Sequence, residues 1–379
     1  MAHHHKIAEE ARQAYDAGRM AESELLYRRA ASDAFELGDL AAWFKHTVWA
    51  ANATWLRGDA KASLTLLLEA RQSEPEDASQ NERWVARKLF FVIARSTRPE
   101  RARLEHFLAD LRSYAAAYHV PGGDFAQLEG RLFLSRGDWR TALTRHEAAW
   151  QAYDGNGYYK SGKAYSAAHC CLRLGQLAAC RDWIAALDQE GKDASHHVWS
   201  AELTLRLAIA EGQPLVTLLS HLRTYIDRAA KQQRYGIIDE VRELTARVHL
   251  LDPYAGDPAT HFHPARAELR RSPKNRQDAH YRYASHLLFL DYRLACLRHG
   301  GSIPAVDDFY YYQPQQVPAH LMPADPDQFQ RRLHKARSAA QSTLRYARDL
   351  DNLLECDWRQ REVQARSERI EEMARAVPS

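Results

Sequence analysis

The sequence contains few cysteines and no long hydrophobic run, and each shortage excludes a class of protein. Its five cysteines, at positions 170, 171, 180, 296 and 356, are an odd number without a paired framework, which is typical of reduced thiols in the cytoplasm. No stretch approaches the roughly 18 consecutive apolar residues of a membrane-spanning helix. Charged residues such as Lys6 and Glu9 interrupt any apolar signal core at the N-terminus. We therefore expect a cytoplasmic protein without a disulfide scaffold or a membrane span.

An excess of one charge and the usual catalytic motifs are also missing. The 379 residues include 52 Lys and Arg against 49 Asp and Glu, a net charge of +3 that is too balanced for wholesale nucleic-acid binding. The patterns GxGxxG after a strand, GxxxxGK[ST], GxSxG and HExxH do not occur. Scattered histidines, such as His261, His263, His280 and His286, lack the Cys or carboxylate spacing of a zinc site. We expect no enzymatic activity, no cofactor and no metal.

What the sequence does contain is a repeat of about 39 residues. RGDAKASLTLLLEA at 57–70 and RGDWRTALTRHEAA at 136–149 place small or apolar residues at matching offsets after glycine. Equivalent anchors fall at 18, 58, 97, 137, 175 and 212, with separations of 40, 39, 40, 38 and 37 residues. A glycine can end a helix in the left-handed conformation, and the following Asp59 or Asp138 can cap the next helix. We interpret both Arg-Gly-Asp sequences as interhelical turns rather than as adhesion motifs.

This pattern resembles the tetratricopeptide repeat (TPR), a helix-turn-helix unit. Seven positions before the anchors, where that family favours a small residue, Ala11, Ala51, Gly130 and Ala168 comply, whereas Phe90 and Leu205 do not. The period exceeds the usual ~34 residues. The resemblance covers roughly residues 6–232 and implies an all-α, TPR-like superhelix of six to seven helix pairs over residues 6–251. Residues 1–5 are expected to be a tag remnant or disordered, and His3 to His5 receive no function.

The remaining residues, 252–379, predict an irregular helical C-terminal region. A Pro- and Tyr-rich loop at 300–326 carries Phe309, Tyr310, Tyr311 and Tyr312, which either strap across the protein's own helices or contact a partner. Residues 327–376 predict one long helix, whose stripe of Leu333, Ala336, Ala340, Ala347, Leu350 and Leu354 packs on the last repeat or on a second copy of the chain. After Trp358 the charged sequence predicts a solvated helix or frayed tail, with a homodimer contact as the alternative.

The TPR resemblance implies a concave wall lined by the first helix of each unit. Six positions before the anchors stand Arg12, Asn52, Phe91, Arg131, His169 and Arg206, and further groove candidates are Lys45, Arg87, Gln127, Tyr165 and Glu202. In members of the family with a carboxylate clamp, basic and Asn side chains hold a peptide carboxylate, and Asn52, Arg131 and Arg206 match by type and position. Arginine suits this task because its fork binds carboxylates bidentately. The alternative is that these arginines form salt bridges between neighbouring units.

Three functions remain open at this point. The first is a scaffold or adaptor that binds an acidic or C-terminal peptide segment in the groove. The second is a TPR-type sensor in which a ligand tightens the superhelix; repeats that begin near residue 6, without a preceding effector domain, disfavour it. The third is nucleic-acid association through the basic runs at 265–276 and 331–348.

Overall fold

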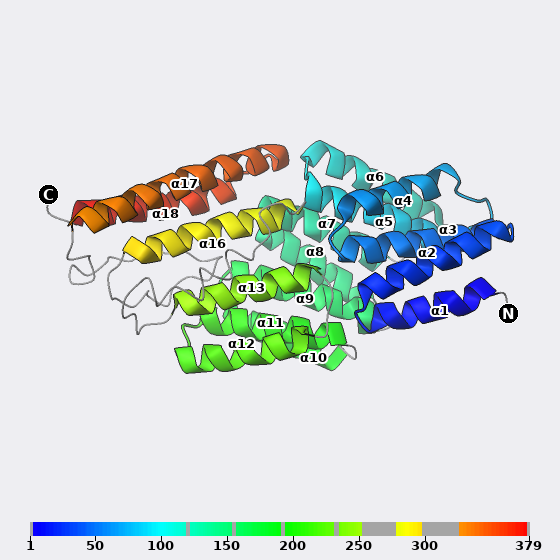
Figure 1. Ribbon diagram of the computed structural model, residues 1–379, viewed down its shortest axis with the longest axis horizontal. Helices are drawn as coiled ribbons and strands as arrows, with labels where there is room; N and C mark the ends of the chain where they lie inside the picture. The colour runs from blue at the N-terminus through cyan, green and yellow to red at the C-terminus, as the bar shows by residue number, and fades with distance from the viewer. Residues whose placement is uncertain are drawn as a thin grey trace.

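The computed structural model describes residues 3–118, 122–153, 157–190, 194–230, 235–251, 278–297 and 326–376. All regular structure in these ranges is α-helical, which confirms the predicted fold class. Consecutive helices pack on one another and form a TPR-like array with a helical extension (Figure 1). The array comprises α1 (His3–Asp16), α2 (Met20–Glu36), α3 (Leu40–Leu56), α4 (Ala60–Gln72), α5 (Gln80–Thr97), α6 (Arg101–Tyr118), α7 (Gly122–Arg136), α8 (Trp139–Gln151), α9 (Gly157–Arg173), α10 (Leu177–Glu190), α11 (Ala194–Ala210), α12 (Leu215–Ala229) and α13 (Tyr235–Leu250). The extension comprises α16 (Ala279–Leu297), α17 (Pro326–Leu354) and α18 (Trp358–Ala376).

The turns within the helix pairs lie where the sequence places them. Gly18, Gly58, Gly137, Gly175 and Gly212 all have positive φ, between 66° and 94°, and each separates the two helices of a pair. Thr97, which stands where the other units have the anchor glycine, ends α5. The carboxylates of Asp59 and Asp138 accept hydrogen bonds from the amides of Ala62 and Thr141, so both aspartates cap the second helix of their pair. Both Arg-Gly-Asp sequences are therefore tight interhelical turns.

Residues 3–5, which belong to the segment expected to be a tag remnant or disordered, form the first turn of α1. His3, His4 and His5 are helical, and His4 is buried. The reason is periodicity, because His4 shares the buried face of α1 with Ile7, Ala11 and Ala14 at three- and four-residue steps.

Small residues allow the helices of a pair to approach closely. Ala11, Ala51 and Ala168 are fully buried in their pairs. At the same repeat position, a Cβ on Gly130 would lie 2.6 Å from Cε1 of His146, so a larger residue would displace that ring. The small positions thus belong to the packing of the array.

The predicted single helix over 327–376 is wrong, because the structure contains two helices that fold back on one another. Glu355 has a φ of 51°, and the amide of Cys356 donates to the carbonyl of Asp351 over 3.0 Å, which closes α17 with a left-handed C-cap. Asp351 also receives hydrogen bonds from the guanidinium of Arg359 over 2.9 Å and from the amide of Gln360 over 3.0 Å. A single aspartate therefore fixes both sides of the bend.

The charged end after Trp358 is not a solvated tail. Arg359, Arg366 and Arg369 are buried, as are Val363, Ile370 and Met373 between them. Arg366 pairs with Asp291 of α16 over 2.6 Å, so burial of its charge is compensated. The stripe predicted on α17 is also buried, and helices of the same chain cover it. The stripe on which the homodimer prediction depended is therefore not available to a second copy.

The C-terminal helices pack against the middle of the array. One hydrophobic cluster joins residues of α5, α6 and α7 to residues of α16, α17 and α18. The indole of Trp358 donates to the carbonyl of Ser135 over 3.3 Å, and Arg173 of α9 pairs with Glu362 over 2.9 Å. Helix α1 and the outer end of α17 lie at opposite ends of the molecule (Figure 1).

Candidate functional site

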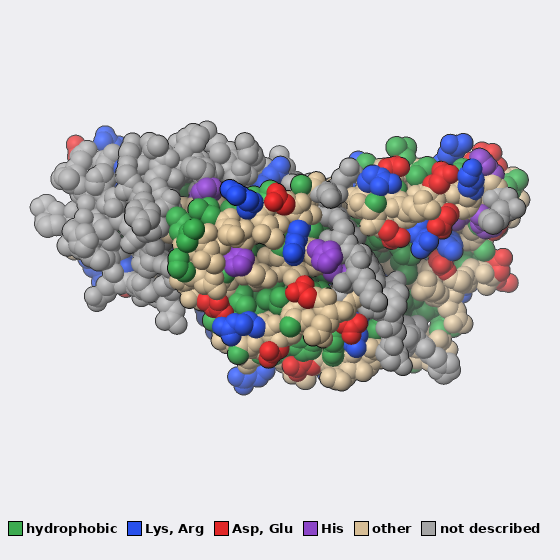
Figure 2. Space-filling model, turned by 90° about the horizontal axis from the view of Figure 1, so that it is seen from below, with side chains coloured by type: hydrophobic (Ala, Val, Ile, Leu, Met, Phe, Trp, Pro, Cys, Tyr) green, Lys and Arg blue, Asp and Glu red, His purple; other side chains and the backbone are tan. Residues whose placement is uncertain are grey.

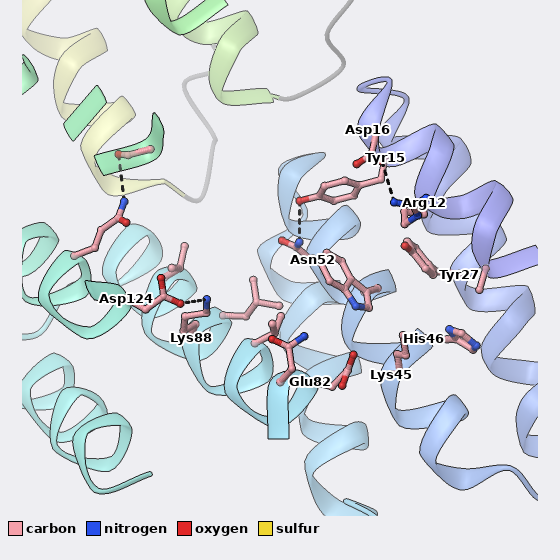
Figure 3. Close-up of a pocket in the computed structure, with 18 of the residues that line it drawn as sticks. Arg12, Tyr15, Asp16, Tyr27, Lys45, His46, Asn52, Glu82, Lys88 and Asp124 are labelled. Atoms are coloured by element: carbon pink, nitrogen blue, oxygen red, sulfur yellow. Dashed lines mark hydrogen bonds and ion pairs between the residues drawn. The ribbon is translucent and has the colours of Figure 1, made fainter. Parts of the chain in front are cut away.

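A cavity of about 970 Å³ lies between the first helices of successive pairs. Helices α1 and α3 form one side and α5 and α7 the other, as Figure 3 shows, while Gly162 of α9 and Trp199 of α11 extend the lining along the array. The volume lies at the upper end of the range of about 300–1,000 Å³ typical of ligand pockets.

Apolar side chains supply much of the lining. Trp49 meets Tyr15 edge-on with ring centroids 5.7 Å apart and stacks against Tyr27 at 6.3 Å. Val85 and Leu89 of α5 face the same cavity. An aromatic wall opposite an aliphatic one can bury apolar side chains of a ligand.

Most of the cavity's charged side chains already have partners. The guanidinium of Arg12 pairs with Glu9 over 2.8 Å on its own helix. Lys88 pairs with Asp124 over 3.2 Å (Figure 3), and the buried Lys163 lies 3.6 Å from the same carboxylate. Burial alone would raise the pKa of Asp124, but the two lysines outweigh it and hold that pKa below its ordinary value. These pairs leave the site mixed in charge rather than uniformly basic.

Arg131 differs from these cations. It lines the cavity from α7, is half-buried, and has no carboxylate at ion-pair distance within the described residues. Loss of hydration, reinforced by Arg95, lowers its pKa to about 10, which still leaves it charged at neutral pH. Burial and the charge of Arg131 also lower the pKa of the adjacent His146 to about 3, so this imidazole is neutral and does not compete for an anion.

Five of the eleven predicted groove residues line the cavity: Arg12, Lys45, Asn52, Gln127 and Arg131. The amide of Asn52 donates to the hydroxyl of Tyr15 over 2.9 Å (Figure 3), and the amide of Gln127 donates to the carbonyl of Gly162 over 3.3 Å. Lys45 is exposed and has no ion-pair partner within the part of the chain that the structure describes.

Four other predicted residues belong to a buried network further along the array. The hydroxyl of Tyr165 donates to Glu202 over 2.6 Å, His169 lies 3.7 Å from the same carboxylate, and Arg206 bonds to both Glu202 and Glu243. Burial raises the pKa of Glu202, yet Arg206 and His169 overcome this and lower it. At Arg206 the structure thus shows the alternative interpretation, an ion pair between neighbouring helices.

The remaining predicted residues do not reach the cavity lining or lie outside the described residues. Arg87 stacks on the ring of Tyr114 at 4.4 Å and lies 3.6 Å from Glu74. Phe91, at the same repeat position as Arg131, is fully buried in the core. The aromatic run Phe309, Tyr310, Tyr311 and Tyr312, the histidines His261 and His263, and the basic run at 265–276 lie outside the described residues.

Sequence reasoning missed several lining residues that occupy two further repeat positions. Thirteen residues before an anchor lie His5, Lys45, Asp124, Gly162 and Trp199, counted from anchors 18, 58, 137, 175 and 212. Nine residues before an anchor lie Glu9, Trp49, Lys88 and Leu128, counted from anchors 18, 58, 97 and 137. Lys45 is among the predicted groove residues, and comparing every position of the first helix across the units would have found the others.

Comparisons with known proteins leave the family open. No protein-family model matches the sequence, and no curated protein matches it. Among solved structures, the chain is similar to the TPR domain of P58(IPK), with 13% identity, a TM-score of 0.25, and coverage of 90% of this chain and 99% of that chain. So low a score carries no weight for the fold, which the helix pairs and their turns define. Among the described helices, none has the length and apolar character needed to cross a membrane.

Proposed function

We propose that this chain is a non-enzymatic, cytoplasmic interaction scaffold that binds an acidic or C-terminal peptide segment in the cavity between α1, α3, α5 and α7. The observation that carries the proposal is Arg131, a half-buried cation that faces the cavity and has no carboxylate partner within the described residues. The five free thiols support the cytoplasmic assignment.

The ligand's charge follows from the desolvation of Arg131. A guanidinium that has lost hydration gains more from an incoming carboxylate than an exposed one does, because the attraction is screened less. Its two parallel N–H groups suit a carboxylate, whether a side chain or the end of a peptide. Lys45 provides a second, exposed cation, while Trp49 and Tyr15 offer an apolar surface for neighbouring ligand residues.

The arrangement differs from the predicted clamp in one respect. Arg206 is buried and already bonded to Glu202 and Glu243, so the proposed site uses Arg131 and Lys45 and leaves Arg206 as part of the scaffold. Figure 2 shows acidic and basic side chains interspersed on one face of the described chain, without a broad area of one sign. Recognition by a few placed cations therefore fits this surface better than attraction to a polyanion.

The test is calorimetric titration of the full chain with an Asp- and Glu-rich peptide, its Asn and Gln counterpart, and the acidic peptide with an amidated C-terminus. A charge-assisted hydrogen bond contributes about 1.5–3 kcal/mol. Arg131→Gln should therefore weaken binding of the acidic peptide about 10- to 100-fold. Lys61→Gln, which alters an exposed lysine of α4 outside the cavity, is the matched control and should change nothing. Equal affinity of wild type and Arg131→Gln would refute the proposed site.

A further inference from the structure

Three histidine side chains meet at the N-terminal end of the array. His4 and His5 come from α1 and His46 from α3, and each offers a ring nitrogen that lies within 4.8 Å of the other two. The ring centroids of His4 and His5 are 4.1 Å apart, and those of His4 and His46 are 5.8 Å apart. The cluster therefore joins two helices that are about forty residues apart in the sequence.

Two of these rings are buried without hydrogen-bond partners. His4 is 1% exposed and His46 is 2% exposed. Within the described residues, Nδ1 of His4 and both ring nitrogens of His46 have no hydrogen-bond partner. A buried polar atom without a partner is unfavourable, so three such atoms at one place favour a bound ligand.

Asp39 supplies the outer contact that a metal-binding histidine usually has. Its Oδ2 lies 3.6 Å from Nε2 of His4, and its Oδ1 accepts a hydrogen bond from the amide of Ala42 over 2.9 Å at the start of α3. The helix cap holds the carboxylate in place beside the imidazole. Nε2 of His4 is then directed at Asp39, which leaves Nδ1 for a metal, the arrangement of a carboxylate–histidine–metal triad.

We propose that His4, His5 and His46 bind one Zn²⁺ ion per chain, with Asp39 orienting His4. Imidazole nitrogens at about 2.0–2.1 Å from tetrahedral zinc lie roughly 3.4 Å apart. Rotation of the exposed His5 and small shifts of the other two rings would bring the three nitrogens to that spacing. No fourth protein ligand belongs to the cluster in the described residues, so the ion keeps an open coordination position. His5 and His46 also line the cavity.

His3 provides a matched control within the same run of histidines. Its ring is 66% exposed and lies 3.8 Å from Asp33, away from the cluster. Zinc capture by a flexible histidine run would depend on His3 and His5 about equally and would ignore His46. A site built by the fold depends on His46 and is indifferent to His3.

The experiment measures Zn²⁺ affinity of the full, chelator-treated chain by competition with a chromogenic chelator. We expect one ion per chain, a loss of at least about 100-fold in affinity for His46→Ala and for His5→Ala, and no change for His3→Ala. Asn caps helices as well as Asp does, so Asp39→Asn should leave the start of α3 intact. It should weaken Zn²⁺ binding about 10- to 100-fold.

Circular dichroism on each variant shows whether the helices persist. If His46→Ala unfolds, His5→Ala still tests the proposal, because His5 is exposed and its replacement should leave the helices intact. Absence of saturable binding in the wild type would overturn the proposal, as would an unchanged affinity in His5→Ala or in folded His46→Ala. The result does not depend on peptide binding, so the two proposals can fail separately.

Discussion

Gly137 occupies a turn that excludes a side chain for two separate reasons. Its φ is +79°, and a Cβ built there would lie 2.4 Å from Cδ1 and 3.1 Å from Cβ of Trp358. Gly175 occupies the equivalent turn in the next unit, with a φ of +69° and no heavy atom within 4 Å of a built Cβ. Gly175→Ala therefore measures the backbone strain alone, and Gly137→Ala measures the same strain plus the contact with the C-terminal helices.

The magnitudes follow from these two effects. A left-handed conformation costs an alanine about 1–2 kcal/mol. Displacing a packed neighbour adds about 1–3 kcal/mol. Trp358 cannot move freely, because its indole donates to the carbonyl of Ser135 over 3.3 Å and packs edge-on against Trp139 at 5.2 Å and Tyr283 at 5.8 Å. We expect a loss of about 1–2 kcal/mol for Gly175→Ala and about 2–5 kcal/mol for Gly137→Ala.

The assay is urea unfolding of the full chain, followed by far-ultraviolet circular dichroism, on both glycine variants, on Trp358→Ala and on the double variant Gly137→Ala with Trp358→Ala. With the indole removed, Gly137→Ala should lose only about as much stability, relative to Trp358→Ala alone, as Gly175→Ala loses relative to wild type. Equal losses for the two glycine variants in the wild-type background would refute the argument. So would an excess loss at Gly137 that persists without Trp358.

Two other predictions concern buried charge. Asp351→Ala leaves Arg359 buried without its carboxylate and should lower the free energy of unfolding by about 3–5 kcal/mol, whereas Arg337→Ala, at an exposed ion pair, should lower it by less than about 1 kcal/mol in the same assay. Asp124 has a lowered pKa in the folded chain, so its stabilising effect is complete above its ordinary value of 3.8 and is lost as pH falls through the lower folded value. The stability difference between wild type and Asp124→Asn should accordingly shrink between pH 7 and pH 3, and a difference that grows on acidification would contradict this sign.

The helix pairs could be predicted from the sequence because their determinants are local. A glycine that tolerates positive φ and an aspartate that caps the next helix act within a few residues of each other, and they recur at a fixed spacing. Gly58 and Asp59 illustrate this, since the structure gives the glycine a φ of +94° and the aspartate a cap on Ala62. The fixed spacing of these residues is then enough to predict where each helix pair lies in the sequence.

The bend between α17 and α18 could not be predicted in the same way. The sequence around Glu355 contains neither glycine nor proline, so helix propensity alone predicts a helix that continues through this residue. The bend is stabilised from a distance, because Trp358 packs at the turn before α8 and Arg359 donates to the carbonyl of Ser135 over 3.0 Å. Such contacts between segments more than 200 residues apart leave no local pattern.

Arg131 and Arg206 occupy the same repeat position but have different environments, and a second residue on the same helix accounts for the difference. Both stand six residues before an anchor glycine, yet one faces the cavity without a carboxylate partner in the described chain and the other is held by two glutamates. Four residues earlier on the same helix, Arg206 has Glu202, whereas Arg131 has Gln127, which is neutral. Side chains four residues apart are neighbours on a helix, so a carboxylate there binds the arginine within its own unit. An arginine at this position can serve a ligand only where its own helix offers no acid, and that condition favours Arg131 over Arg206.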